Sequence, residues 1–184
     1  LRLVLNEIKI NLVIIDTIIL IPGKNLEAIL FMGARLKMEK NIKKNIKGNK
    51  YKQLLNWVSE SSTVFSFVTR KDVGISERSV MLIESLTEFL VDSYPTNEWL
   101  SNEIVDSPII GHIYFYELNK TTKNILLEVS NSLFDWGDDA LTDLPEDIAF
   151  YDEKRCPVLH VNGHENYAII EVSSLKEYLK LTFL

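Results

Sequence analysis

Residues 134–172 read FDWGDDALTDLPEDIAFYDEKRCPVLHVNGHENYAIIEV, and this stretch decides the fold. Three short runs rich in apolar residues, at 148–151, 156–161 and 167–172, are separated by the polar tip DEKR and by an Asn-Gly pair. Alternating apolar residues, aromatic β-formers and an Asn-Gly turn signal are typical of consecutive antiparallel strands. Pro145 suits the loop before the first run, because its ring fixes φ and it lacks a backbone N–H. The stretch therefore predicts a three-stranded antiparallel meander with one face against a core.

Two more strands and a helix are predicted upstream of the meander. Residues 63–69 and 109–118 are rich in β-branched and aromatic residues, so we expect a strand in each. Apolar residues at helical spacing follow Ser76, whose hydroxyl makes it a good N-cap. We therefore expect a helix over residues 77–93, and we expect Pro95 to end it.

The other segments complete an α+β pattern. Residues 97–105 are expected to form a loop with a turn of helix. A helical pattern begins at Asn119, and Ser173 or Ser174 is placed to cap a short final helix that runs through Leu179. The sequence thus predicts an α+β fold, an antiparallel sheet with a C-terminal three-stranded meander, packed by two or three helices.

The composition indicates one globular domain in a reducing compartment. The chain has 184 residues, of which 46% are hydrophobic and 25% charged, and these values are typical of folded domains. A single Cys leaves no internal disulfide and favours a cytoplasmic protein.

The charge is unevenly distributed along the chain. Residues 1–60 carry 11 Lys and Arg against 5 Asp and Glu, whereas residues 61–184 carry 9 against 21. Phosphate backbones need cationic side chains, so the acidic part disfavours nucleic acid as a ligand. A basic protein partner matches this charge better.

The first 37 residues do not read as part of the domain. The apolar run INLVIIDTIILIP at residues 10–22 is too short for a bilayer span and contains Asp16. A signal-peptide interpretation lacks a small-residue cleavage site. We expect residues 1–37 to be a non-native or poorly ordered extension, in preference to an anchor or signal segment, and residues 38–184 to form a single domain. No membrane association is expected.

Residues 38–60 are rich in Lys and form a helix candidate, which is stronger over residues 50–59. Gly48 weakens the middle of this candidate. A lysine run can act as an arm for nucleic acid or membranes. Because no aromatic residues or amphipathic Trp/Leu face accompany it, we interpret it as a solvated helix start.

The acidic loop and the strand that follows it are the candidate partner-binding site. Their carboxylates, with aromatic side chains as anchors, suit recognition of a basic protein surface. The predicted partner-binding residues are Trp136, Asp138, Asp139, Asp143, Glu146, Asp147 and Tyr151. The alternative is an ordinary solvated acidic loop.

A second cluster contains Cys156, His160, His164 and Glu165. On a strand, the four-residue spacing of the first two spans about 13 Å, too far for one metal ion. A Cys–His nucleophile needs its base within hydrogen-bond reach, and this spacing does not provide that; a sole Cys is more often buried. No metal site and no catalytic residue are therefore predicted. A hydrolase with a His160, His164 and Glu165 site remains the alternative function.

Other motif-based functions find no support in the sequence. The Asp residues at 135–143 do not follow the spacing of an EF-hand calcium loop. The chain has no Walker loop, GxGxxG, GxSxG, HExxH or CxxC motif. We therefore expect no cofactor.

A block formed by Trp136, then Leu-Pro-Glu-Asp at 144–147, Phe150-Tyr151 and His164-Glu165 resembles a segment of short, uncharacterised bacterial proteins. It departs from that pattern at Cys156-Pro157, where an aromatic residue is expected. Some small acidic bacterial proteins of this build act as immunity proteins against secreted toxins. The resemblance implies a non-enzymatic, bacterial, cytoplasmic protein whose basic partner is a toxin, and it carries no catalytic residue to this chain.

Overall fold

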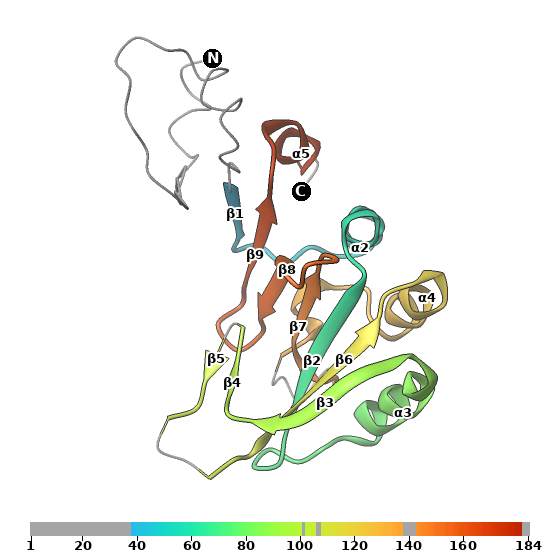
Figure 1. The fold of residues 1–184 in the computed structure, drawn as a ribbon, viewed down its shortest axis with the longest axis vertical. Coiled ribbons are helices and arrows are strands. Elements are labelled where there is room, and N and C mark those ends of the chain that lie inside the picture. The colour runs from blue at the N-terminus through green and yellow to red at the C-terminus, as the bar shows by residue number, and fades with distance from the viewer. Residues whose placement is uncertain (1–37, 101, 106–107, 138–142, 182–184) are drawn as a thin grey trace. The chain divides into compact units, whose positions relative to one another are not determined.

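The computed structural model describes residues 38–100, 102–105, 108–137 and 143–181, and it confirms the α+β fold (Figure 1). The main sheet has seven strands in the order β1-β9-β8-β7-β2-β6-β3. These strands are β1 (Met38–Ile42), β2 (Val64–Arg70), β3 (Leu90–Thr96), β6 (Gly111–Glu117), β7 (Glu146–Tyr151), β8 (Pro157–Asn162) and β9 (Tyr167–Val172). The segments β4 (Glu98–Trp99) and β5 (Asn102–Glu103) form a separate two-stranded sheet.

Four α-helices and two single-turn 3₁₀ helices accompany the strands in the described residues. They are α2 (Asn49–Ser61), α3 (Glu77–Ser85), α4 (Lys120–Val129), α5 (Leu175–Lys180), η1 (Thr87–Phe89) and η2 (Leu133–Asp135). None of the helices in this part of the chain has the length and apolarity that a bilayer crossing requires. The predicted extension, residues 1–37, lies outside the described residues.

The chain divides into two compact units. The described part of the first contains residues 38–40 and 171–181, where the Lys40 ammonium donates to the carbonyl of Leu181 at 2.8 Å and lies 5.8 Å from the ring centre of Tyr178. Burial lowers the pKa of Lys40. The second unit spans residues 41–170 and contains every residue discussed below as a candidate site.

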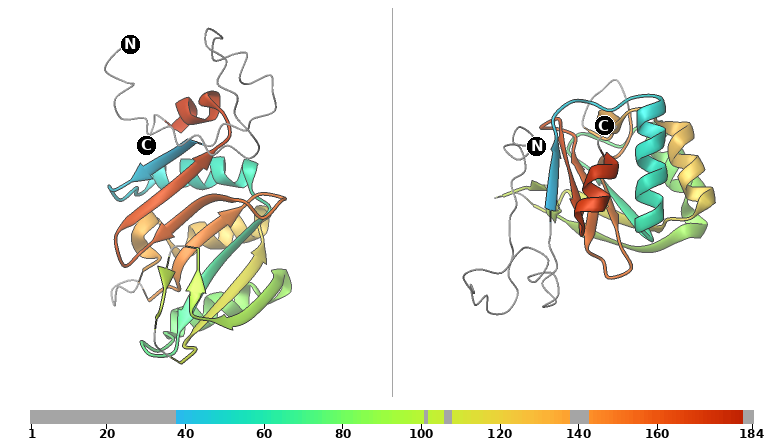
Figure 2. Two further views of the ribbon diagram at one scale, coloured as in Figure 1. Left: turned by 60° about the vertical axis from the view of Figure 1, so that its left-hand side comes forward. Right: turned by 90° about the horizontal axis from the view of Figure 1, so that it is seen from above.

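One face of the sheet in the second unit holds an aromatic core under α2 and α4. Phe65 and Phe67 of β2 pack against Tyr116 of β6, with ring centres 5.5 and 5.2 Å from the tyrosine. The indole of Trp136 stacks on Phe67 and donates its N–H to the hydroxyl of Tyr51 in α2 at 3.0 Å. The two helices lie side by side over this face (Figure 2). Their apolar stripes explain why the sequence places helices here.

The opposite face of the sheet carries a smaller apolar cluster. Val68, Ile113 and Trp99 pack together there, so the side chain of Trp99 joins β4 to the sheet. Beside them, the ring centre of Phe115 lies 6.0 Å from that of Tyr94 and 5.9 Å from that of Tyr151.

The meander prediction is confirmed, although its second turn differs in detail. β7, β8 and β9 pair as consecutive antiparallel strands. The residue with positive φ in the second turn is Asn166 (φ 53°), at its far end. Gly163 is required for another reason, because a Cβ there would overlap the backbone of Trp136 and Gly137.

The prediction of a helix over residues 77–93 is wrong in its second half. α3 ends at Ser85, and β3 runs from Leu90 to Thr96 as the edge strand beside β6. Pro95 lies inside this strand instead of ending a helix, which an edge strand tolerates because only one side of it is paired. Pairing with β6 has overridden a helical apolar spacing.

Two further sequence interpretations need correction. Residues 38–60 are not one helix, because they contain β1, which ends at Ile42, and most of α2, which begins at Asn49. Gly48 lies just before α2 with φ 60°, and its backbone N–H donates to the carbonyl of Asn131 at 2.7 Å. The segment around Trp99 is a β-hairpin without a helical turn. By contrast, α4 begins at Asn119 as expected, and the side chain of Asn119 caps the helix by accepting hydrogen bonds from the backbone N–H groups of Thr121 and Thr122.

Candidate partner-binding site

The predicted acidic, aromatic-studded face is not exposed as expected. Trp136, Glu146, Asp147 and Tyr151 are buried, with exposed fractions of 0, 6, 3 and 8%. Asp138 and Asp139 lie outside the described residues, and Asp143 is exposed. The expectation that the four buried side chains form an accessible surface is therefore wrong, and each has a structural explanation.

Asp147 joins three segments of the fold. Its two carboxylate oxygens accept hydrogen bonds from the indole N–H of Trp99 at 2.7 Å and from the backbone N–H of Gly163 at 2.8 Å. Its own N–H donates to the carbonyl of Trp136 at 2.9 Å, and its φ is 55°. A buried carboxylate needs such donors, since unpaired burial is costly. The sequence offers no sign of them, because Trp99 and Gly163 are distant in the chain.

The two aromatic residues of the predicted site are part of the packing. Trp136 is fully buried between Phe67 and Tyr51. Burial raises the pKa of Tyr51 to about 12, against the opposing effect of the hydrogen bond from Trp136. Tyr151 lies with its hydroxyl 3.1 Å from the hydroxyl oxygen of Ser66, and burial raises its pKa. Neither ring is placed as an anchor for a partner.

Glu146 and Asp143 line a cavity in the second unit, beside a charged cluster at the end of β2. The guanidinium of Arg70 binds the carboxylate of Asp72 through two hydrogen bonds, of 3.1 and 2.6 Å, and lies 3.6 Å from a carboxylate oxygen of Glu146. The hydrogen bonds from Arg70 lower the pKa of Asp72. Two carboxylates thus share one guanidinium.

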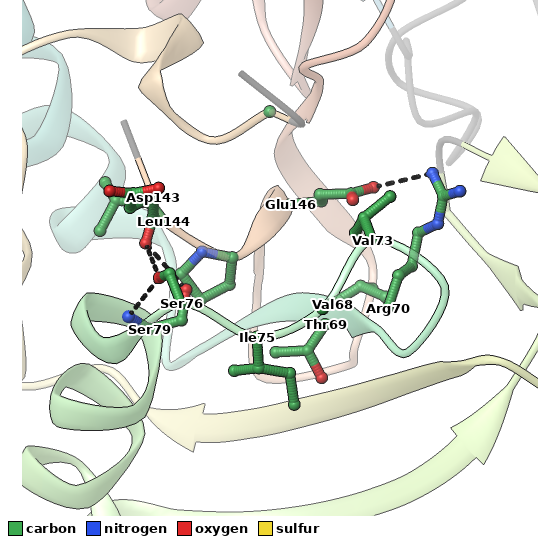
Figure 3. Close-up of a pocket in the computed structure, with 13 residues that line it drawn as sticks. Val68, Thr69, Arg70, Val73, Ile75, Ser76, Ser79, Asp143, Leu144 and Glu146 are labelled. Carbon is green, nitrogen blue, oxygen red and sulfur yellow. Dashed lines mark hydrogen bonds and ion pairs between the residues drawn. The ribbon is translucent and has the colours of Figure 1, made fainter. Parts of the chain in front are cut away.

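The cavity itself has a volume of about 320 Å³. In Figure 3, Arg70 and Glu146 lie on one side of it, and Ser76, Ser79 and Asp143 lie on the other. Both serine hydroxyls donate to the carbonyl oxygen of Asp143, at 2.5 and 2.9 Å, which fixes the loop before β7. The described residues that line it are Val68, Thr69, Arg70, Val73, Gly74, Ile75, Ser76, Ser79, Gly137, Asp143, Leu144, Pro145 and Glu146. The cavity is of the size that small ligands or single side chains fill.

Exposed apolar side chains gather in one part of the chain that the sequence interpretation did not single out. All the large hydrophobic side chains classed as exposed in the described residues lie between positions 73 and 109. We call them the 73–109 surface: Val73, Ile75, Val80, Met81, Leu90, Val91, Tyr94, Leu100, Val105 and Ile109. They belong to the β2–α3 loop, α3, the edge strand β3 and the loops around β4 and β5 (Figure 1).

Acidic side chains accompany these apolar ones. Residues 73–109 contain seven Asp and Glu and a single basic residue, Arg78. A guanidinium nitrogen of Arg78 donates to the carbonyl of Val129, so this cation is engaged within the fold. Six of the carboxylates are described and all are exposed: Glu77, Glu84, Glu88, Asp92, Glu98 and Glu103. The same signal could have been read from the sequence, where this stretch is both apolar and acidic.

The second cluster of the sequence interpretation does not form a site. His160 is buried within β8, whereas His164 and Glu165 are exposed in the turn that follows. Cys156 is exposed and precedes β8, which corrects the expectation of a buried thiol. In the described part of the chain, no group of three or more His, Cys, Asp or Glu residues is arranged to hold a metal ion. The hydrolase alternative therefore has no assembled set of side chains.

Comparison with protein-family models, with curated proteins and with solved structures gave no match.

Proposed function

We propose that this protein is a non-enzymatic protein-binding module that recognises a basic partner through the 73–109 surface. The observation that carries the proposal is the coincidence of exposed apolar and exposed acidic side chains in one stretch of the chain, residues 73–109, which includes α3 and the edge strand β3. Apolar groups provide binding energy when they are desolvated, and the surrounding carboxylates steer and select a cationic partner. Clusters of exposed apolar side chains commonly mark interaction sites.

The same charge pattern argues against other occupants. A phosphate backbone would meet carboxylates without compensating cations. A two-fold contact between two copies would bring this acidic stretch against itself, which like-charge repulsion disfavours. A partner with Lys or Arg beside apolar residues fits both features of the surface.

The resemblance to immunity-like bacterial proteins gives the finer form of the proposal, an immunity or antitoxin factor in the cytoplasm whose partner is a toxin. The single Cys supports the cytoplasmic assignment. Neutralisation of a toxin encoded by a neighbouring gene would support this finer form, and failure to neutralise it would count against it.

The experiment compares partner capture by the wild-type chain and three variants. The first variant combines Met81→Ser, Leu90→Ser and Val91→Ser, which removes exposed apolar groups. The second combines Glu84→Gln, Glu88→Gln and Asp92→Asn. The control combines Glu153→Gln and Glu165→Gln, two exposed carboxylates outside the surface.

We expect a protein retained by the wild type and the control, lost from both surface variants, and released by salt. The affinity of that purified protein for the apolar variant should fall at least tenfold, about 1.4 kcal/mol. Equal retention by all forms would contradict the proposal. Circular dichroism should show that every variant is folded, as expected for changes at exposed positions.

A further inference from the structure

The cavity at the end of β2 shares residues with the 73–109 surface. Val73 and Ile75 line the cavity and are about half exposed, at 48 and 47%. An interface commonly centres on a pocket that one anchoring side chain fills. We propose that this cavity takes one basic side chain, Arg or Lys, of the partner. The inference rests on the proposed function and assigns the cavity as its anchor point.

The charges around the cavity favour a cation. Among the described residues that line the cavity, Arg70 is the cationic one, and its guanidinium already contacts the carboxylates of Asp72 and Glu146. Asp143 adds an exposed carboxylate at the opposite wall. The described lining thus carries two carboxylates, of Asp143 and Glu146, against one guanidinium, and this surplus of one negative charge is balanced by a cationic head group. A partly enclosed cleft strengthens this attraction, because its low-dielectric walls focus the field.

The walls of the cavity suit the rest of such a side chain. Val68, Val73, Ile75, Leu144 and Pro145 supply apolar contact between the two charged ends. Lys and Arg pack their methylene stems against apolar surface while the head group stays near polar atoms. An anion would meet the surplus carboxylates, and a wholly apolar group would desolvate them without a new partner. A basic side chain satisfies both the walls and the charge.

The test uses N-acetyl-arginine amide and N-acetyl-norleucine amide as probes, followed by ¹⁵N NMR of the full chain. Norleucine keeps the linear apolar stem and lacks the charge. We expect the arginine probe to shift the amide signals of Gly74, Ile75 and Gly137 with a Kd in the millimolar range. The norleucine probe should bind at least fivefold more weakly. Equal affinities, or no shifts at these amides with the arginine probe, would overturn the inference.

Variants separate the cavity from the rest of the surface. Ile75→Ser removes an exposed wall residue, and Glu146→Gln removes the buried charge while keeping its shape; each should weaken the arginine probe at least fivefold. Glu153→Gln, at the exposed β7–β8 tip, is the control and should leave binding unchanged. If Glu146→Gln fails to fold, Ile75→Ser still decides the result. Partner binding that is lost with Leu90→Ser and Val91→Ser and kept with Ile75→Ser would reject the anchor pocket while retaining the proposed function.

Discussion

The indole N–H of Trp99 donates to the carboxylate of Asp147 across 48 positions of sequence, at 2.7 Å, with both side chains buried. This bond ties the β4–β5 hairpin to the start of β7, and the second oxygen of the carboxylate binds the turn at Gly163. Asp147, which the sequence analysis predicts on a partner-binding face, is thus a buried residue that holds separate segments of the fold together.

Trp99→Phe should destabilise the fold beyond the effect of the lost ring volume. The substitution removes the N–H that a buried carboxylate accepts, and hydrogen bonds to charged groups contribute about 1.5–3 kcal/mol. Urea unfolding measures the change in free energy. Trp57→Phe, the same substitution at a buried Trp of α2, is the control and should cost less. Equal losses for the two variants would show that the bond to Asp147 does not stabilise the protein.

Gly163→Ala should be among the most damaging small substitutions. A Cβ there would overlap the backbone of Trp136 and Gly137, and overpacking costs about 1–3 kcal/mol, with the upper end expected where backbone must move. Gly74→Ala is the control: its Cβ would meet open space, although its φ of 83° still costs about 1 kcal/mol. Thermal unfolding compares the stabilities of the two variants, and we expect the lower midpoint temperature for Gly163→Ala. A Gly163→Ala protein as stable as Gly74→Ala would refute the close approach.

The free energy of unfolding should fall at alkaline pH because of the buried hydroxyl of Tyr51. Burial raises the pKa of its hydroxyl to about 12, above the ordinary value for tyrosine, so the folded state holds this proton more tightly than the unfolded state. The contribution is therefore fully present below about pH 10 and is lost as the pH rises towards 12, at about 1.4 kcal/mol per pH unit. Urea unfolding between about pH 9 and pH 12 measures the slope. Tyr51→Phe should reduce the slope and leave the part that Tyr116 and Tyr151 contribute, since burial also raises the pKa of these two hydroxyls. An unchanged slope in that variant would contradict the assignment.

The thiol of Cys156 should react in the native protein. The residue is exposed in the polar segment before β8. We expect one equivalent of a thiol reagent such as DTNB to react with the folded chain within an order of magnitude of its rate in denaturant, because access is not limited by unfolding. A reaction that requires denaturant would place the thiol inside the fold. Cys156→Ser supplies the zero-reaction control.

Asn119→Ala should weaken α4 by about 1 kcal/mol, since the side chain accepts hydrogen bonds from the N–H groups of Thr121 and Thr122 in a capping box. Chemical denaturation measures the loss. Asn124→Ala, at an exposed position within the same helix, is the control and should be neutral or slightly stabilising, because Ala is the better helix former. Comparable losses in both variants would indicate that the cap contributes nothing.

Local elements of this protein could be predicted from its residues. Alternation in residues 146–172 predicted the meander, because a strand places successive side chains on opposite faces whatever its neighbours are. The start of α4 at Asn119 and the positions of β2 and β6 followed from equally local chemistry. The apolar and acidic composition of residues 73–109 was also visible, although only burial showed which of those side chains remain exposed.

Long-range contacts, by contrast, determine which polar residues are internal and where residues 90–96 belong. Helical spacing at 77–93 gave way to strand pairing, because β6 offers β3 a row of hydrogen-bonding partners that a single-sequence pattern cannot reveal. The Asp147 carboxylate became a connector because Trp99 and Gly163, far away in the chain, bring their N–H groups to it. The periodicity of a sequence indicates the face of its own helix or strand on which a side chain lies. Whether a charged side chain can be buried depends instead on hydrogen-bond donors that other elements supply.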